Sequence, residues 1–128
     1  MTDPFIRYTI SQGLLETVDV NGVATSLGPA YSGNGECLND PAKTWVVGHG
    51  PIPVGVYYIG PAENRPESVG AFALPLTPDP ATVMNGRSGF FIHGDNPALN
   101  HTASDGCVVT ARAIRECIAS YDVLRVVA

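Results

Sequence analysis

Short apolar segments separated by glycine- and proline-rich turns are the main pattern along this chain. Apolar and polar positions alternate in residues 5–10 and 71–76, as expected for strands that bury one face. The predicted strands are 5–10, 14–20, 23–27, 56–59, 71–76, 89–92 and 123–127. The 14 glycines and 11 prolines are spread through the chain and supply the turns between these strands. The sequence therefore predicts a mostly β fold.

One segment, residues 110–119, has the periodicity of an α-helix. Apolar side chains recur there at the i, i+3, i+4 and i+7 spacing of a single buried stripe. The stripe consists of Ile114, Cys117, Ile118 and Tyr121. Thr110 is the predicted N-cap of this helix. We therefore expect one main helix, placed after Cys107 in the chain.

Two longer segments lack apolar periodicity and are predicted to be loops. Residues 31–41 form a polar, glycine-rich stretch that is too long for a simple turn, and loops of that kind often carry function. Residues 61–70 are predicted to be a surface connection.

Length and composition favour one compact domain with its own core. The 128 residues fit a single domain spanning 1–128, and 45% apolar residues are enough for a core. The net charge is −5, Lys43 is the only lysine and the arginines are scattered, so nucleic-acid and anionic-lipid binding are not expected. No apolar stretch is long enough to span a bilayer, and the N-terminus lacks the basic and apolar regions of a secretory signal.

A histidine and a cysteine lie close together in the sequence, the first after an apolar run and the second after a glycine-containing run. His93 follows the apolar run 90–92, and Cys107 comes fourteen positions later, at the start of another apolar run. Neighbouring strand ends would bring the two side chains together. An imidazole can generate a thiolate, the strongest nucleophile among ordinary side chains. The pattern predicts cysteine-dependent acyl transfer with His93 as the base and Cys107 as the nucleophile.

The residues around this pair favour access to the sulfur. Gly94 and Gly106 carry no side chain that would crowd a substrate, and the backbone N–H groups of Gly106 and Cys107 are candidate oxyanion donors. Cys107 also precedes the predicted helix, whose N-terminal dipole would stabilise a thiolate. A catalytic Cys107 is therefore expected to react with alkylating reagents well below the pKa of about 8.5 of a free thiol.

The other two histidines are weaker candidates for the catalytic base. His101 is the competing base, but its polar neighbours predict a loop, and a strand end is the more rigid mount for a catalytic side chain. His49 precedes Gly50 and is interpreted as a turn residue. A buried structural thiol beside a structural His93 is the plain alternative. The closely spaced glycines and Ser104 around the pair argue against it.

A metal site is a further alternative for the same region. His93, Asp95, His101 and Cys107 include ligand types that zinc prefers. The sequence has no Cys-x-x-Cys pair and no histidine pair at three- to five-residue spacing, so neither a metal nor another cofactor is expected.

The remaining cysteines leave two possibilities open. Cys37 lies in the polar loop and Cys117 on the predicted helix. In an oxidising compartment the two would be free to pair and leave Cys107 reduced. Otherwise Cys117 is a small core residue and Cys37 a loop thiol.

The motifs together resemble a known family. The Ile92-His93-Gly94 run followed by Ser104-Asp105-Gly106-Cys107 looks like the L,D-transpeptidase (YkuD-type) signature, which usually has histidine at the position of Asp105 and often arginine at that of Val109. The whole chain more closely resembles the small L,D-transpeptidase-like effectors of type VI secretion systems. The further runs that carry this resemblance are Tyr31-Ser32-Gly33-x-Gly35 with Asn39-Asp40-Pro41, and Gly50-Pro51-Ile52-Pro53-x-Gly55-x-Tyr57.

The resemblance implies an L,D-transpeptidase-like β-sandwich or barrel that acts on the tetrapeptide stems of peptidoglycan. Cys107 would attack the carbonyl between meso-diaminopimelate and the terminal D-alanine, and His93 would pass the thiol proton to the leaving D-alanine. Water would complete an L,D-carboxypeptidase reaction, a D-amino acid would give exchange, and a second stem would give a crosslink. The sequence leaves open which acceptor dominates.

The same resemblance implies roles for the surrounding residues. Ser104 would orient His93 or shape the pocket. Arg112 would either meet a substrate carboxylate or be an exposed helix arginine with no role. The residues implied to line the substrate cleft are Tyr31, Ser32, Asn39, Gly94 and Asp105.

The resemblance also implies a setting for the protein. Such effectors are made in the cytoplasm without a signal peptide, are secreted, sometimes with a carrier of the secretion apparatus, and act in the periplasm of a target bacterium. The producing cell then needs an immunity protein. The rival hypothesis is a non-catalytic binding or structural module of a phage or secretion apparatus, motivated by Asp105. A cysteine hydrolase that acts on another amide or ester is a third hypothesis. The oligomeric state is also left open.

Overall fold

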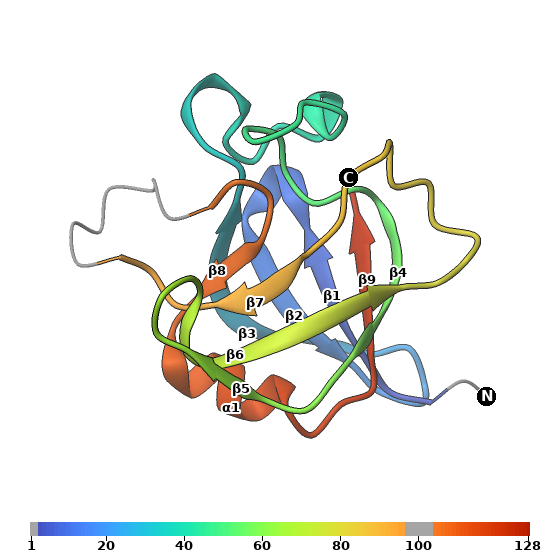
Figure 1. Ribbon diagram of the computed structural model, residues 1–128. Coiled ribbons are helices and arrows are strands. Elements are labelled where there is room, and N and C mark those ends of the chain that lie inside the picture. Colours follow the sequence, from blue (N-terminus) through green and yellow to red (C-terminus); the bar gives the residue numbers. More distant parts are fainter. Residues whose placement is uncertain (1–2, 97–103) are drawn as a thin grey trace.

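Nine β-strands and one α-helix form within the described residues, 3–96 and 104–128, of this computed structural model (Figure 1). The strands are β1 (Phe5–Thr9), β2 (Leu14–Val18), β3 (Ala24–Ser32), β4 (Gly55–Ile59), β5 (Glu63–Arg65), β6 (Gly70–Pro78), β7 (Phe91–His93), β8 (Val108–Thr110) and β9 (Val123–Val127). The helix is α1 (Arg112–Ile118), and three short 3-10 helices are Ile10–Gln12, Gly35–Cys37 and Pro41–Lys43. The mostly β class with one main helix after Cys107 is confirmed.

Eight of the strands close into a barrel. They follow the order β4-β9-β1-β2-β3-β8-β7-β6, and pairing of β4 with β6 closes the ring, while β5 extends β6 on the outside. Most neighbours are antiparallel, but β1 pairs with β9 and β7 pairs with β8 in parallel. Because parallel neighbours run in the same direction, β7 and β8 bring two segments that are distant in the sequence to the same end of the sheet.

The barrel interior holds the hydrophobic core. In β1 and β9 every second side chain is buried, which is the period-two pattern that the sequence showed. The fully buried large side chains of the core include Ile6, Tyr8, Ile10, Leu15, Ile52, Tyr57, Leu74, Ile92, Ile118 and Leu124. Strands β7 and β8 are therefore packed against a close-packed, rigid core.

Strand β3 is longer than the sequence predicted. It continues through Gly28 and Pro29 to Ser32, so Tyr31 and Ser32 belong to a strand and not to the expected loop 31–41. The register of β3 against β2 shifts by one residue beside Gly28, whose φ of 143° lies where glycine is favoured. A β-bulge therefore lies directly before Gly28, and Gly28 and Pro29 remain paired with β2, so the strand does not end there.

The predicted surface loop 61–70 contains a strand. β5 pairs with β6 through Glu63 and Arg65, and its side chains are half-buried or exposed. No apolar alternation marks such an outer strand, so periodicity gave no signal for it.

The helix begins later than predicted. Thr110 is the last residue of β8, and its hydroxyl donates to the carbonyl of Pro29 at 2.9 Å. Ala111 takes the N-cap position without a side-chain hydrogen bond. The predicted Thr110 cap is therefore wrong, because the hydroxyl anchors β8 to β3.

The buried face of α1 also differs from the predicted stripe. Ile118 is fully buried, but Cys117 is exposed and Arg115 takes a buried position. Within residues 3–96 and 104–128, no helix has the length and apolarity needed to cross a membrane.

Candidate active site

The register of β7 and β8 places His93 and Cys107 on one face of the sheet. Ile92 pairs with Val108 and His93 with Val109, so Cys107 immediately precedes β8 beside Phe91. Because side chains two residues apart on a strand share a face, the side chains of Cys107 and His93 lie on the same side, offset by two residues along the strands. The two residues singled out from the sequence therefore share one face of the β7–β8 pair.

His93 is buried and held in one tautomer. The residue is only 5% exposed, and its Nδ1 lies 2.7 Å from the carbonyl oxygen of Gly94. A carbonyl only accepts hydrogen bonds, so Nδ1 carries the proton and the lone pair of Nε2 is left to act as a base.

The Cys107 thiol is bonded to the backbone of the neighbouring segment. Sγ accepts from the N–H of Phe91 at 3.3 Å and makes a long contact of 3.9 Å with the carbonyl of Gly89. Among the described residues, Cys107 and His93 make no hydrogen bond with each other. The thiol is therefore held by the backbone of Phe91 in β7 and of Gly89 just before this strand.

The electrostatic setting favours a neutral thiol and a neutral imidazole. Burial raises the pKa of Cys107, the Phe91 N–H and Arg87 lower it, and Asp105 raises it. Burial also lowers the pKa of His93, and the charge of Arg115 lowers it further, against raising contributions from the Gly94 carbonyl and acidic neighbours. Both shifts disfavour a resting thiolate–imidazolium pair.

The expected help from the helix is absent. Strand β8 separates Cys107 from α1 in the chain, so Cys107 does not precede the helix N-terminus directly. Burial raises the pKa of Cys107, a direction opposite to the one expected from the sequence, and alkylation of this thiol against pH remains the test.

Ser104 organises the turn that carries the nucleophile. It is fully buried, and its hydroxyl donates to the Cys107 carbonyl at 2.5 Å while accepting from Gly33 N and Gly106 N, each at 3.0 Å. It makes no hydrogen bond to His93, so its contacts shape the turn and do not orient the base. The Gly106 N–H is already engaged, which leaves the Cys107 N–H as the candidate oxyanion donor of the turn.

Ser32 anchors the same turn from β3. Its hydroxyl donates to the Gly106 carbonyl at 2.8 Å and accepts from Ile52 N at 2.8 Å. Its backbone is bonded to Asn39, whose side-chain oxygen accepts from Ser32 N at 3.0 Å and from Tyr8 Oη at 3.1 Å. Because Ser32 is fully buried, it supports the site from below and does not line a cleft.

Tyr31 and Asn39 do line a hollow. Together with Val109, they border an open hollow of about 430 Å³ whose rim includes Asp95. The Tyr31 hydroxyl donates to Asp95 Oδ1 at 2.7 Å. Asp95 also borders a second hollow of about 300 Å³ that contains His93 and Gly94. The two hollows meet at Asp95, which the sequence analysis did not place among the substrate-binding residues.

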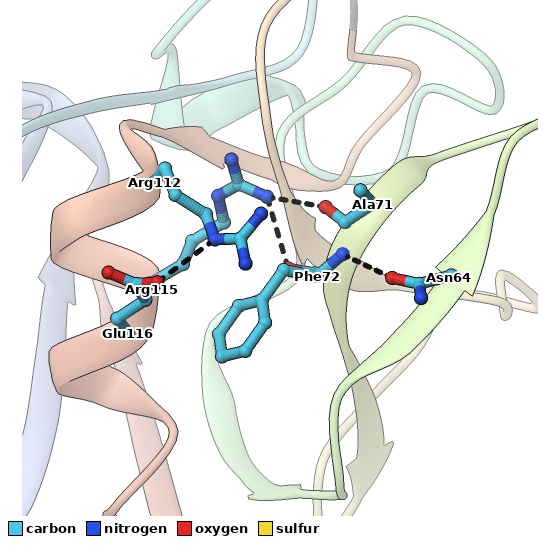
Figure 2. A network of polar contacts seen from close by, with 6 residues as sticks. All are labelled: Asn64, Ala71, Phe72, Arg112, Arg115 and Glu116. Atoms are coloured by element: carbon cyan, nitrogen blue, oxygen red, sulfur yellow. Dashed lines mark hydrogen bonds and ion pairs between the residues drawn. The ribbon is translucent and has the colours of Figure 1, made fainter.

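Arg112 lies on the exposed side of α1. Its Nε donates to Glu116 at 3.2 Å, and its guanidinium stacks 4.5 Å from the centre of the Phe72 ring (Figure 2). The arginine is thus engaged with its own helix and with β6, and it borders none of the hollows described above.

Arg115, one turn along α1, lies next to the candidate site and was not predicted from the sequence. Its Nη1 donates to the carbonyls of Ala71 and Phe72 at 2.9 and 3.0 Å (Figure 2), while its buried Nε has no hydrogen-bond partner. A Cβ added to Gly94 would lie 2.8 Å from Nη2. The cation therefore rests against the residue that holds His93. The helical stripe gave no signal for it, because a charged residue was expected to face solvent.

Arg87 is a second missed residue. It is 8% exposed and donates to four backbone carbonyls around the Cys107 turn. It lies in the glycine-containing stretch before β7, where neither periodicity nor a motif marks it.

The other predicted residues occupy peripheral positions. Asp105 is exposed, and its side chain accepts from Asn34 Nδ2 at 3.4 Å. His49 is also exposed, with Nδ1 2.8 Å from Asn34 Oδ1. His101, the competing base, lies outside the described residues.

The cysteines and possible metal ligands complete the description. Cys37 and Cys117 are both free, and Cys117 is exposed on α1 and not a core residue. Within the part of the chain that the structure describes, no group of three or more His, Cys, Asp or Glu side chains is arranged to hold a metal ion.

Comparison with known structures shows what this fold is. The described barrel is similar to Bd1075 from Bdellovibrio bacteriovorus, with a TM-score of 0.65 and 19% identity over 98% of this chain and 48% of that one. It is also similar to L,D-transpeptidase 1 of Mycobacterium tuberculosis (TM-score 0.59, 16% identity, 98% of this chain and 62% of that one). An L,D-transpeptidase from Xylanimonas cellulosilytica gives a TM-score of 0.61 at 16% identity, over 98% and 61%.

These relationships are of fold, and the chain spans only about half to three fifths of the length of these three structures. No relative was found among the curated proteins. A family model, described as the Tlde1 domain, matches residues 27–126, which include both β7 and β8. The predicted resemblance to type VI secretion L,D-transpeptidase effectors is confirmed at the level of the family: this chain belongs to the Tlde1 domain family and has an L,D-transpeptidase-like fold.

Proposed function

We propose that this domain is a peptidoglycan-modifying cysteine enzyme that removes the terminal D-alanine from tetrapeptide stems. The observation that carries the proposal is the placement of His93 and Cys107 on one face of the parallel pair β7–β8, in a chain of the Tlde1 domain family. The fold is similar to that of L,D-transpeptidases, and His93 and Cys107 are residue types that can act as base and nucleophile.

The reaction begins from a neutral pair. Sγ of Cys107 attacks the carbonyl carbon of meso-diaminopimelate, and its proton passes to Nε2 of His93 as the carbon–sulfur bond forms. The Cys107 N–H donates to the resulting oxyanion. Collapse of this intermediate breaks the bond to D-alanine, whose amine takes the proton from His93, and a thioester remains on Cys107.

The acceptor decides the product. Water, deprotonated by His93, hydrolyses the thioester and gives the carboxypeptidase reaction. A D-amino acid or the amine of a second stem replaces water in exchange or crosslinking. Asp95 borders both hollows, and His93 lines the smaller one, so we propose that they receive the donor stem and the acceptor.

Purified disaccharide-tetrapeptide tests this proposal. The intact domain is expected to release D-alanine, C107A is expected to release none, and C117A is a matched control because that thiol is exposed on α1. Release by C107A at the rate of the intact domain would overturn the mechanism.

We further propose that the domain acts as an antibacterial effector in the periplasm of a target cell. Family membership supports this role. A domain directed to the periplasm by an added signal is expected to arrest growth, whereas C107A directed in the same way is not. A protein that protects the cell by binding the domain would be its immunity partner.

A non-catalytic module is the second candidate. The lack of a direct Cys107–His93 hydrogen bond among the described residues and the raised thiol pKa favour it. It predicts no D-alanine release by the intact domain, even where the tetrapeptide binds, so the same assay separates the two candidates.

A further inference from the structure

Arg87 connects three separate segments of the chain behind the nucleophile. Its Nη1 donates to the carbonyls of Thr44 at 2.6 Å and Pro51 at 2.8 Å. Its Nη2 donates to the carbonyls of Gly50 and Asp105, both at 2.9 Å. One buried guanidinium thus holds two loops against the turn that contains Cys107.

The contact with the turn is close. Asp105 lies two residues before Cys107, and its carbonyl is fixed by Nη2 of Arg87. The guanidinium also stacks 5.1 Å from the centre of the Phe90 ring, directly before β7. A Cβ on Gly106 would overlap the guanidinium and the Phe90 ring, so the turn passes over Arg87 with no room for a side chain. Arg87 therefore contacts Phe90, which leads into the strand of His93, and Asp105, which leads to Cys107.

The bonding pattern requires arginine. A planar guanidinium offers five N–H donors in fixed directions, and here four carbonyls are met by its two terminal nitrogens. A lysine ammonium has three donors at one point and cannot reach the same set of carbonyls from one position.

We propose that Arg87 is a positioning residue for the nucleophile: it fixes the Asp105–Gly106 turn so that Cys107 is presented to substrate beside His93, and its charge stabilises the thiolate as it forms. The effect on turnover rests on the proposed function. The effect on the thiol does not, because it follows from the geometry of the turn.

The charged groups around the thiol support this role. Asp105 and Arg87 face Cys107 with opposite effects, and the charge of Arg87 opposes the rise in the pKa of the thiol that burial causes. On its other sides Arg87 faces Tyr57 and Cys37, and burial lowers its own pKa. Removing the cation leaves the raising effect of Asp105 on the thiol pKa without the opposing charge of Arg87.

The test compares R87K, R87Q and the control R125Q, which alters an exposed arginine of β9 that stacks on Phe5 of β1. Three quantities are measured: kcat and KM for disaccharide-tetrapeptide, the pH midpoint of alkylation at Cys107 read by mass spectrometry of its peptide, and the thermal unfolding midpoint. R87Q is expected to lose roughly 10²-fold in kcat, since a displacement of about 1 Å at the reacting atoms has that effect, with little change in KM. Its alkylation midpoint is expected to move to higher pH, and R87K is expected to fall between R87Q and the intact domain.

Two outcomes would overturn the inference. One is a folded R87Q whose kcat and alkylation midpoint match those of R125Q, which would reduce Arg87 to a structural residue. If R87Q does not fold, R87K decides, and an unchanged kcat together with an unchanged midpoint contradicts the proposal. If the intact domain releases no D-alanine, the proposed function fails, and the alkylation midpoints still test the position of Arg87.

Discussion

The two halves of the candidate site are built differently. On the nucleophile side, the Ser104–Cys107 turn is fixed by Ser104, by Ser32 from β3 and by Arg87, and each of these groups is buried and bonded. On the base side, His93 has one hydrogen bond, to the carbonyl of the residue that follows it. Behind that residue lies Arg115, with a buried Nε that has no partner.

The difference indicates which half adjusts. A nucleophile held by several buried hydrogen bonds is preorganised, and moving it would cost all of them together. The His93 imidazole has one printed hydrogen bond among the described residues, so fewer buried contacts are lost if the base side is altered. We therefore expect the base side to be the more adjustable half, and substitutions on the two sides test this difference.

The largest expected effect comes from adding a methyl group on the nucleophile side. Gly106 has φ of 141°, and a Cβ there would overlap Arg87 and Phe90, so G106A is expected to cost about 3 kcal/mol or more in unfolding free energy. G94A is its counterpart on the base side, where the added methyl meets only the movable end of Arg115 at 2.8 Å. Its expected cost is about 1 kcal/mol.

Urea unfolding of both variants measures this contrast. A G94A variant as unstable as G106A would contradict the idea that the base side is the adjustable half.

The next effect comes from removing one hydroxyl from the turn. S104A leaves the N–H groups of Gly33 and Gly106 without their acceptor, and an orphaned buried donor costs about 1–3 kcal/mol. We expect S104A to lose about 2 kcal/mol in stability or more, and to lose activity because the turn relaxes. S120A, which removes an exposed hydroxyl bonded to the Cys117 carbonyl, is the control and is expected to be nearly neutral. Equal stability of the two variants would contradict the role of Ser104.

The base side is tested by its pH profile. The general base works when His93 is neutral, so activity falls as the pH drops through its pKa. Burial and then the charge of Arg115 lower that pKa, so R115Q is expected to raise it and move the acidic limb of kcat/KM to higher pH. R115K keeps the positive charge and is expected to leave the acidic limb of kcat/KM at the pH of the intact domain. R112Q, which alters the exposed neighbouring arginine, should leave it in place, and an R115Q limb identical to that of R112Q would exclude the electrostatic role of Arg115.

The smallest expected effects are on stability. His93 has a lowered pKa in the folded state, so its contribution is complete above the unfolded value of about 6.5 and is lost as the pH falls through the folded value. Cys107 has a raised pKa, so its contribution is complete below the ordinary thiol value and is lost as the pH rises through the folded value.

Unfolding free energies of H93Q and C107A across the pH range check these signs. H93Q is expected to lose less stability in acid than the intact domain, and C107A less in alkali. The reverse order would contradict the buried, neutral state of both groups.

Much of the fold followed from local patterns. The strands with period-two burial, such as β1 and β9, were predictable because one face of each lies in the core. The polar strand β5 and the continuation of β3 through Gly28 were not, because pairing with a neighbouring strand and a β-bulge decided them. These are tertiary effects that a local window does not contain.

The candidate site divides in the same way. The spacing of His93 and Cys107 was informative because each residue adjoins its own strand, and the register then brought them to one face. Arg87 and Arg115 were not predictable, because their burial depends on carbonyls of remote segments such as Gly50 and Phe72. An isolated arginine is expected at the surface until those partners are known.

The most direct test of the central claim is the mass of the enzyme during turnover. The intact domain is mixed with disaccharide-tetrapeptide, quenched in acid within the first turnovers, and digested for mass spectrometry. We predict an acyl adduct on the Cys107 peptide, with an added mass equal to that of the substrate less D-alanine. No adduct is expected on the Cys37 or Cys117 peptides. D-alanine release without any adduct on Cys107, or an adduct on one of the other two cysteines, would contradict the claim.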